Sequence, residues 1–350
     1  MSQPEGDPDI SVIILNYNGA KWLDRCLATL RQQTIFQRIE VIVADNASSD
    51  GSDQLAQKLL EGWPNGRFID NGGNLGYCAG NNRGAEAARG KYLFFLNNDT
   101  WLEADCLEKL LSAVESANAG AANPLVLDYD DDTMQSLGAS GFDFFGLTDA
   151  MKAASNTVEI FAACGAAYFI STGLFRQLGG FDGEFFLYSD ETDLSWRAWI
   201  AGCRVVAVPS ARMHHRGAAA VNPAGGTRIV ESRTSTAKRF YATRNGILFL
   251  LKNSQHFLLM LLIPHLLLLA IEAFASLLVV RRWSFVREAY LSALADCWRL
   301  RAHIAQERKR IKGFRRHGDF WMLRFLRWRP SRWEEVRRVF RAGLPKVDYR

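Results

Sequence analysis

Cysteine and proline are scarce in this sequence, and what it lacks narrows the class of protein. The six cysteines lie far apart, with no C-x-x-C pair and no His/Cys cluster at metal-ligand spacing, so we expect neither a disulfide framework nor a structural zinc site. With 9 prolines and no low-complexity stretch, fibrous and disordered chains are excluded. Residues 1–9 lack the basic start and apolar core of a secretory signal, so we expect the main body in the cytosol.

The chain has 350 residues, enough for two domains at about 150 residues each, and its charge is unevenly divided. Residues 281–350 hold 20 Lys and Arg against 7 Asp and Glu, a net of +13, whereas residues 1–280 hold 22 against 30, a net of −8. An acidic body therefore precedes a basic tail. This asymmetry predicts a polyanionic partner for the tail, either an anionic membrane leaflet or nucleic acid.

Up to about residue 210, short β-branched or aromatic runs alternate with amphipathic helical stretches, which is typical of an α/β domain with a largely parallel sheet. We predict helices over 22–30, 50–60, 77–88 and 103–116, and an irregular region over 128–150. The predicted strands are 10–15, 39–44, 67–69, 91–96, 160–170 and 204–208.

The tail begins with a long apolar run. Residues 257–280 are apolar except for His265, Glu272 and Ser276, and these 24 residues could cross a bilayer core of about 30 Å as a helix. The three polar residues share one helical face, and an acid at mid-bilayer costs about 2.5–3.5 kcal/mol on insertion scales. The sequence leaves open whether this run spans a membrane, lies on it or forms the core of a helical subdomain.

Two later segments, 283–298 and 314–328, are rich in Arg and in Trp, Phe and Leu, as interfacial helices are. We therefore favour a helical, basic, membrane-associated region over residues 244–350. Nucleic acid is not the expected partner, because bases stack on exposed aromatic side chains of sheets and grooves rather than on Leu-rich helices.

Polar residues follow three predicted strands, and ligands of open α/β sheets bind at such strand ends. The ends read Asn16 to Gly19, Asp45 to Gly51 and Asn97 to Thr100. Each could be a simple turn or helix cap. Together they offer what a pyrimidine nucleotide needs: Asp45 to accept the base N3–H or the ribose hydroxyls, and Asp99 as a hard ligand for Mg²⁺ or Mn²⁺ beside a diphosphate.

The glycine-rich stretch 74–84 is not a dinucleotide-binding loop. It lacks the G-x-G-x-x-G spacing and does not follow the first strand, and no G-x-x-x-x-G-K-[ST] occurs in the sequence. Dehydrogenase and P-loop kinase functions are therefore not expected.

Six ordered motifs resemble those of family 2 glycosyltransferases, most nearly the bacterial rhamnosyltransferase-like branch, over about residues 9–250. They are VIILNYNG (12–19), VIVADNASSDGS (41–52), GNLGYCAGNNRG (73–84), LFFLNNDT (93–100), GGFDGEFFLYSDETDLSWRA (179–198) and HHRG (214–217). The resemblance implies a GT-A fold over residues 1–243, with a nucleotide-sugar-binding half and an acceptor-binding half.

The resemblance also implies roles for single residues. Metal binding falls to Asp99, the single carboxylate of Asn97-Asn98-Asp99, and to His214, with His215 as the alternative. Arg244-Asn245 matches a motif whose role stays open. The implied nucleotide-sugar-binding residues are Asn16, Asn18, Asp45, Ser48, Asn74, Gly76, Asn81 and Asn98.

The catalytic base is expected in an acidic pair at a helix start, here Asp190-Glu191. The family usually uses the second member, hence Glu191, but the pair is reversed in order, so Asp190 stays possible. A carboxylate at a helix N-terminus is expected to be ionised, as a base must be. Without the other motifs, these acids would simply complement the helix dipole, and Asp193 would pair with Arg197.

The implied activity is inverting transfer of a sugar, with rhamnose as one candidate, from a UDP- or dTDP-sugar to a hydroxyl of a cell-envelope glycan or lipid-linked acceptor. The expected location is the cytoplasmic face of the membrane, attached peripherally or by a single span. Two rivals are a non-catalytic, membrane-bound sugar-nucleotide-binding protein and a nucleotidyltransferase. The second should carry a Gly-rich, basic loop after the first strand, which residues 16–20 lack.

Overall fold

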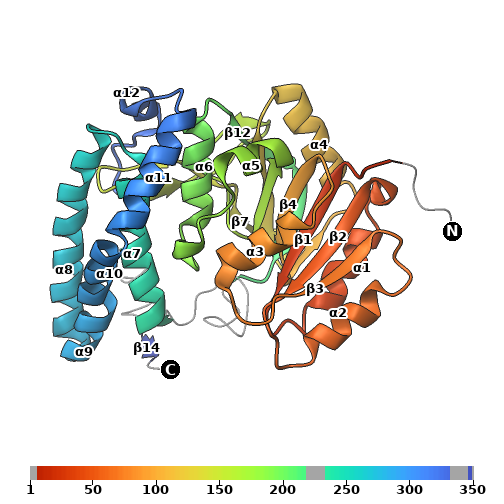
Figure 1. Ribbon diagram of the computed structural model, residues 1–350, viewed down its shortest axis with the longest axis horizontal. Coiled ribbons are helices and arrows are strands. Elements are labelled where there is room, and N and C mark those ends of the chain that lie inside the picture. Colours follow the sequence, from red (N-terminus) through yellow and green to blue (C-terminus); the bar gives the residue numbers. More distant parts are fainter. Residues whose placement is uncertain (1–5, 218–232, 332–345, 349–350) are drawn as a thin grey trace.

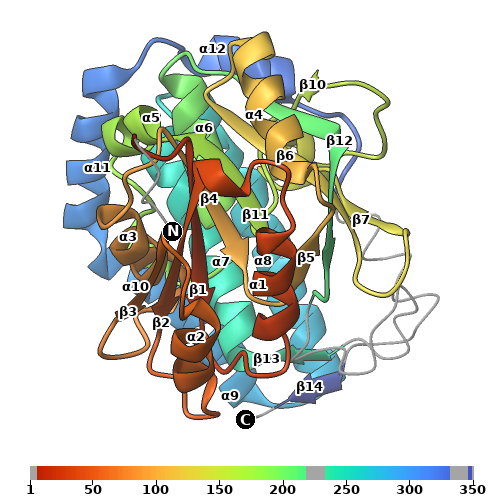
Figure 2. The same ribbon diagram turned by 90° about the vertical axis from the view of Figure 1, so that its right-hand side faces the viewer.

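A mixed sheet forms the centre of the molecule, with helices on both faces (Figures 1 and 2). The computed structural model describes residues 6–217, 233–331 and 346–348. In spatial order the strands are β10 (Val158–Glu159), β12 (Val205–His215), β6 (Ala121–Asp128), β11 (Ala167–Ser171), β4 (Tyr92–Asn97), β1 (Ile10–Asn16), β2 (Ile39–Asp45) and β3 (Gly66–Asp70). β5 (Thr100–Leu102) pairs with β12, β7 (Met134–Ser136) with β6, β8 (Ala139–Phe142) with β9 (Thr148–Ala150), and β13 (Arg233–Ser235) with β14 (Lys346–Asp348).

Strands β4, β1, β2 and β3 are parallel, as the alternation of strands and helices predicts. All seven residues of β2 are buried, which is usual for a parallel strand covered on both faces. Helices α1 (Leu23–Arg31), α2 (Ser52–Leu60) and α4 (Cys106–Ala117) pack on one face of the sheet, and α3 (Gly76–Glu86), α5 (Thr172–Leu178) and α6 (Asp190–Ile200) pack on the other.

The predicted strand over 160–170 is wrong in its first part, because β11 begins only at Ala167. Side chains from other elements hold the backbone before that point. The Trp199 indole donates to the backbone carbonyls of Ile160 and Phe161 at 3.1 Å each, and the side-chain Oδ1 of Asn123 accepts from the Cys164 N–H at 2.6 Å. The region 128–150, expected to be irregular, contains the short strands β7, β8 and β9.

The C-terminal helices pack against the α/β part instead of standing apart. The expected boundary at 243/244 lies inside α7, and the helices share one hydrophobic core with the face of the sheet that carries α6. They are α7 (Thr236–Asn253), α8 (Leu262–Val280), α9 (Trp283–Val286), α10 (Ser292–Arg299), α11 (Arg301–Phe314) and α12 (Asp319–Met322). A π-helical turn, Arg287–Leu291, joins α9 to α10.

The second predicted interfacial segment, 314–328, does not form a continuous helix. It contains only α12 and one 3₁₀ turn, Leu323–Phe325. Trp321 and Phe325 pack on Trp199, with ring centroids 5.7 and 4.8 Å from it. The aromatic side chains that suggested a membrane-facing helix therefore serve in part to attach this segment to the body.

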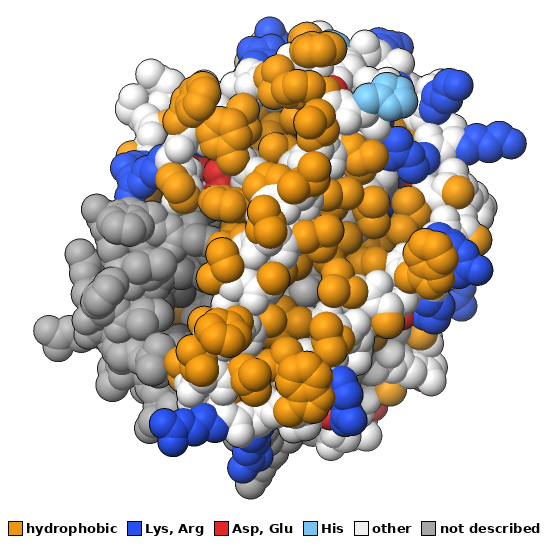
Figure 3. Space-filling model, turned by 90° about the vertical axis from the view of Figure 1, so that its left-hand side faces the viewer, with side chains coloured by type: hydrophobic (Ala, Val, Ile, Leu, Met, Phe, Trp, Pro, Cys, Tyr) orange, Lys and Arg blue, Asp and Glu red, His pale blue; other side chains and the backbone are white. Residues whose placement is uncertain are grey.

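The apolar run forms a continuous helical segment, Leu258–Val280, with a mean hydropathy of 2.3, and only 17% of its most apolar window is buried. Its outward side chains form a large apolar surface bordered by Lys and Arg (Figure 3). The predicted polar stripe faces the protein: His265 Nδ1 lies 2.6 Å from the Phe145 carbonyl, and Ser276 Oγ lies 3.1 Å from Tyr290 Oη. By length and composition this helix could cross a membrane, but one of its faces already contacts the rest of the protein.

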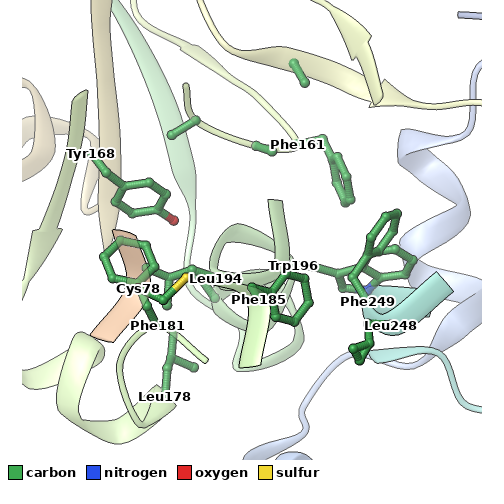
Figure 4. Packing of buried hydrophobic residues seen from close by; sticks show 14 of the residues in the cluster. Cys78, Phe161, Tyr168, Leu178, Phe181, Phe185, Leu194, Trp196, Leu248 and Phe249 are labelled. Atoms are coloured by element: carbon green, nitrogen blue, oxygen red, sulfur yellow. The ribbon is translucent and has the colours of Figure 1, made fainter. Parts of the chain in front are cut away.

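Aromatic packing fixes helix α6 between the sheet and the C-terminal helices (Figure 4). The Trp196 ring lies 5.5 Å from Phe161 and 5.6 Å from Phe249 of α7, measured between centroids. Because large interlocked side chains resist sliding, the first turn of α6 has a fixed position relative to both parts of the chain.

Candidate functional site

The carboxyl ends of β1, β2 and β4 meet at one edge of the sheet, as predicted. Asn16 is paired with Asp45, and Leu15 is paired with Asn97. The buried Asn16 amide joins the three ends: its Nδ2 donates to Asp45 Oδ1 at 2.7 Å, and its Oδ1 accepts from Asn98 Nδ2 at 2.9 Å. Asn16 therefore positions the two other ends and has little capacity left for a ligand.

Asp45 and Ser48 form a compact turn at the end of β2. Ser48 donates to the Asp45 carboxylate twice, from its N–H at 2.8 Å and from its Oγ at 2.6 Å. Asn18, exposed and with a φ of 53°, accepts the Ser49 N–H at 2.8 Å and so ties the first turn to the second. Tyr17, 51% exposed, lies beside this pair of turns and offers a flat surface to a ring.

The Gly/Asn-rich turn before α3 is built on amide contacts. Asn74 Oδ1 accepts the Gly76 N–H at 3.0 Å, and Asn46 Nδ2 donates to the Gly76 carbonyl at 3.1 Å. Asn74 is exposed and within reach of a ligand. Asn81, by contrast, is 1% exposed and donates to the Tyr77 carbonyl within α3, so its position is structural.

Of the two candidate histidines, His215 is the one that lies beside Asp99. Its Nε2 is 3.4 Å from Asp99 Oδ1. His214 points the other way: its ring stacks on Trp101 at 3.6 Å between centroids, and its Nδ1 lies 2.8 Å from the Asp128 carbonyl. The structure therefore favours the alternative, His215, over His214 as a partner of Asp99 in metal binding.

Gln135, on β7, orients the His215 ring. The Gln135 Nε2 donates to the His215 carbonyl at 2.7 Å, which leaves its Oε1, 3.3 Å from His215 Nδ1, to accept the ring N–H. The lone pair of Nε2 then faces Asp99 and the Asn97 amide. One carboxylate and one imidazole, each 15% exposed, suit a divalent cation that takes further ligands from phosphate and water. Among the described residues, no group of three or more His, Cys, Asp and Glu side chains forms a closed cage.

The acidic pair follows a loop with an unusual backbone. Phe186, Tyr188 and Ser189 have φ angles of 58°, 72° and 61°, a region that costs non-glycine residues about 1–3 kcal/mol each. Such a loop keeps its shape only when other groups hold it. Asp190 and Glu191 come directly after it, at the start of α6.

Arg244 and Asn245 of α7 hold this loop in place. They form the motif whose role the sequence left open. Asn245, fully buried, donates through Nδ2 to the carbonyls of Phe185, Leu187 and Tyr188 at 2.9, 2.8 and 2.8 Å. The Arg244 guanidinium donates to the carbonyls of Glu184 and Phe185 and to Asp296 of α10. The C-terminal helices thus fix the entry to the acidic pair.

Asp193 and Arg197 do form the ion pair that the simpler explanation of this helix start included, and the pair belongs to a buried charge cluster. Arg197 Nη2 lies 2.7 Å from Asp193 Oδ2, and both side chains are fully buried. Lys252 of α7 contacts Asp193 at 3.1 Å and also Asp182. Arg197 and then Lys252 hold the pKa of Asp193 below its usual value despite burial, and Lys252 does the same for Asp182.

Burial opposes the expectation that a carboxylate at this helix start is ionised. Burial, and then the charge of Glu191, raises the pKa of Asp190 well above its usual value. Burial also raises the pKa of Glu191. Because repulsion acts against ionising both, the pair favours a single negative charge.

Glu191 lies toward the strand ends. A methyl group at Gly165 would lie 3.5 Å from its Oε2, and the carbonyl of the next residue, Ala166, accepts the N–H of Asn97 at 3.1 Å. The Tyr77 hydroxyl donates to the Gly165 carbonyl at 2.8 Å, and burial, followed by the charges of Asp190 and Glu191, raises its pKa. The structure thus connects the acidic pair, α3 and the end of β4 through one turn.

Sequence reasoning missed Gln135 and Tyr77. Gln135 stands in a region expected to be irregular, and nothing in its neighbourhood marks it as a partner of His215. Tyr77 lies inside a recognised motif, but its hydroxyl acts on Gly165, 88 residues away, and sequence alone gives no signal for that contact.

Comparison with known proteins finds a family match for part of the chain. Residues 11–179 match the model for Glycosyl transferase family 2. The N-acetylglucosaminyl-diphospho-decaprenol L-rhamnosyltransferase of Mycobacterium tuberculosis is 28% identical over 237 residues, covering 59% of this chain and 76% of that protein. The Bacillus subtilis glycosyltransferase EpsH is 34% identical over 105 residues, so the chain spans only 30% of that relative's length.

Solved structures show the same fold at low identity. The mannosyltransferase PcManGT from Pyrobaculum calidifontis, in complex with GDP-Man and Mn²⁺, gives a TM-score of 0.51 at 15% identity, covering 89% of this chain and 86% of that one. S. aureus TarS 1–349 in complex with UDP gives 0.53 at 13% identity, covering 96% and 92%. Residues 11–179 thus match a family 2 glycosyltransferase domain, and the chain has a GT-A-like fold.

Proposed function

We propose that the chain transfers a sugar, with inversion, from a UDP- or dTDP-sugar to a hydroxyl of a cell-envelope glycan or lipid-linked acceptor. The observation that carries the proposal is the turn at Gly165 and Ala166, which lies beside Glu191 and is hydrogen-bonded to the end of β4, two residues before Asp99. The mycobacterial relative is named an L-rhamnosyltransferase, which supports rhamnose as the first sugar to test.

The donor would lie along the joined strand ends. Asp45 offers carboxylate lone pairs for the base or ribose, and the exposed Asn18 and Asn74 offer amides from the two flanking turns. Ser48 and Asn98 contribute by holding these turns in place, through Asp45 and Asn16 respectively. The diphosphate would then lie near Asp99 and His215.

Glu191 would act as the general base. It takes the proton of the acceptor hydroxyl while the acceptor oxygen bonds to the anomeric carbon, and the bond from that carbon to the diphosphate oxygen breaks with its electron pair leaving on the nucleoside diphosphate. Asp99 and His215 would hold Mg²⁺ or Mn²⁺, which supplies positive charge against the departing diphosphate. A raised pKa makes Glu191 a stronger base than an ordinary carboxylate.

The location we propose is the cytoplasmic membrane surface, with α8 lying on the membrane rather than across it. Along its length this helix is attached to the body: His265 to the Phe145 carbonyl, Glu272 to Arg239 at 3.3 Å and Ser276 to Tyr290. A span would give up these partners and leave Glu272 in hydrocarbon. The opposite, apolar side remains available to lipid (Figure 3).

Single cysteines introduced at Gln255 and Arg281, before and after the helix, test this topology. Peripheral attachment predicts that an impermeant thiol reagent added from the cytoplasmic side labels both positions. Labelling of only one position would show that the helix spans the membrane.

The enzymatic proposal is tested by transfer from UDP-, dTDP- and GDP-sugars in the wild type, Glu191→Gln and Asp190→Asn, with the exposed Glu86→Gln as a matched control. We expect Glu191→Gln to lose roughly 10²–10⁴-fold in kcat while still binding donor, and Glu86→Gln to remain active. Equal activity in all four would remove the acidic pair from the mechanism. Donor binding without any transfer would favour a binding protein, and pyrophosphate release would favour a nucleotidyltransferase.

A further inference from the structure

The apolar surface of the C-terminal helices has a basic pocket at one edge. The surface includes Met260, Ile263, Leu267, Ile271, Phe274 and Leu278, each at least 60% exposed. Contiguous exposed apolar surfaces of this kind mark contacts with membranes or partners. The pocket, about 360 Å³ in volume, lies where α7 leads into α8, against α11, and is lined by Lys252, His256, Arg308, Lys309, Lys312 and Arg315.

Four of these cations have no carboxylate partner within 4 Å in the part of the chain that the structure describes. Arg308 donates to the carbonyls of Leu251, Ser254 and Gln255, and Arg315 donates to those of Asn253 and His317. The carbonyl oxygens accept hydrogen bonds from the two guanidinium groups but do not neutralise their positive charges. Lys309 and Lys312 are exposed, one turn apart on α11.

The other charges near the pocket cancel only part of this field. Lys252 is already neutralised by Asp182 and Asp193. Asp319 is directed to the backbone, where it accepts the N–H groups of Gln255, His256 and Leu258 at 2.8–3.0 Å. Burial and, less strongly, the charge of Arg308 lower the pKa of Arg315, while the charge of Asp319 raises it in part. An added anion would relieve both effects.

The pocket adjoins the apolar surface at the position that lipid headgroups would occupy. His256, in the lining, precedes Phe257, which is 46% exposed and stacks on the 77% exposed Phe320 at 5.4 Å. With these rings and Met260 at the acyl boundary, the lining cations would lie about one headgroup layer away.

We propose that this pocket binds the phosphate of an anionic phospholipid headgroup when the apolar surface lies on the membrane. The proposal rests on the peripheral attachment proposed above and adds a defined headgroup site to it. A chain held at both the headgroup and the acyl level would keep a fixed orientation on the bilayer.

The test compares two double variants in flotation with phosphatidylcholine vesicles, with and without phosphatidylglycerol. Lys309→Gln with Lys312→Gln alters the pocket, and Arg282→Gln with Arg287→Gln, exposed positions beyond the other end of α8, removes the same charge elsewhere. General attraction predicts a loss of about fivefold per charge in both. A headgroup site predicts at least a further tenfold loss in the pocket variant, confined to phosphatidylglycerol vesicles, and equal losses would overturn it.

Soluble probes separate the pocket from membrane attachment. Dihexanoyl phosphatidylglycerol below its micellar concentration should raise the melting temperature of the wild type but not of Lys309→Gln with Lys312→Gln, while both proteins melt alike without lipid. An equal shift in both would overturn the pocket. The same saturable shift with inorganic phosphate would make it a site for free anions instead. Failure of the wild type to float, with the lipid shift intact, would contradict only the peripheral attachment.

Discussion

Asn245→Ala removes the side chain that holds the loop before the acidic pair. The amide donates to the carbonyls of Phe185, Leu187 and Tyr188 at 2.8–2.9 Å inside the protein; alanine removes this donor from all three, and Arg244 still donates to that of Phe185. Leaving buried polar groups unpaired costs about 1–3 kcal/mol each, but one amide has only two hydrogens, so we expect a loss of about 2–4 kcal/mol in unfolding free energy.

The expected effect on catalysis is larger than on folding. Phe186, Tyr188 and Ser189 have positive φ angles, so a released loop should relax toward ordinary backbone and displace Glu191. A displacement of about 1 Å can cost roughly 10²-fold in rate, and we expect that loss in kcat with little change in donor KM. Steady-state kinetics and chemical unfolding of the same preparations measure the two effects.

Asn253→Ala is the matched control. Asn253 is the same residue type on the same helix, fully buried, and donates to Asp193 at 2.9 Å instead of to the loop. It should lower stability by a similar amount and leave kcat within a few-fold of the wild type. The positioning role is refuted if both variants lose kcat equally, or if Asn245→Ala is destabilised but fully active.

Three other predictions concern the base, the metal partner and the charge cluster. Since burial raises the pKa of Glu191 and a base must be ionised, kcat/KM should fall as the pH drops through a midpoint above the ordinary 4.5, and a midpoint at or below 4.5 would contradict this. Gln135→Leu removes the acceptor that orients His215, so the Mn²⁺ concentration for half-maximal activity should rise about 10–100-fold; an unchanged Mn²⁺ titration would refute the contact. Because Lys252 lowers the folded-state pKa of Asp182, the carboxylate contributes stability above the unfolded pKa, about 3.9, that is lost as the pH falls below it; urea midpoints below pH 4 should therefore drop more steeply in the wild type than in Asp182→Asn.

The strand ends could be predicted because parallel strands place their carboxyl ends at one edge, so local motifs were enough to bring Asn16, Asp45 and Asn97 together. The choice between His214 and His215 could not be predicted from the sequence. Neighbouring residues in a strand point to opposite faces, and a register shift in β12 between Val208 and Arg212 decides which face meets Asp99.

The residue that holds the loop before the acidic pair could not be predicted from the sequence either. Asn245 and Phe185 are 60 residues apart, and their contact arises only when α7 packs beside α6. The amphipathic pattern over 314–328 misled for a related reason, since Trp321 and Phe325 are apolar side chains that meet the protein rather than lipid. A pattern shows that a face is apolar, and tertiary packing decides what covers it.

The most direct test is a crystal structure with Mn²⁺ and the nucleoside diphosphate that the transfer assay selects. We expect the anomalous signal of Mn²⁺ between the Asp99 carboxylate and His215 Nε2, and the terminal phosphate facing Glu191 with room for one hexose. Mn²⁺ on His214, or a nucleotide whose phosphate opens onto a surface away from Glu191, would contradict the account.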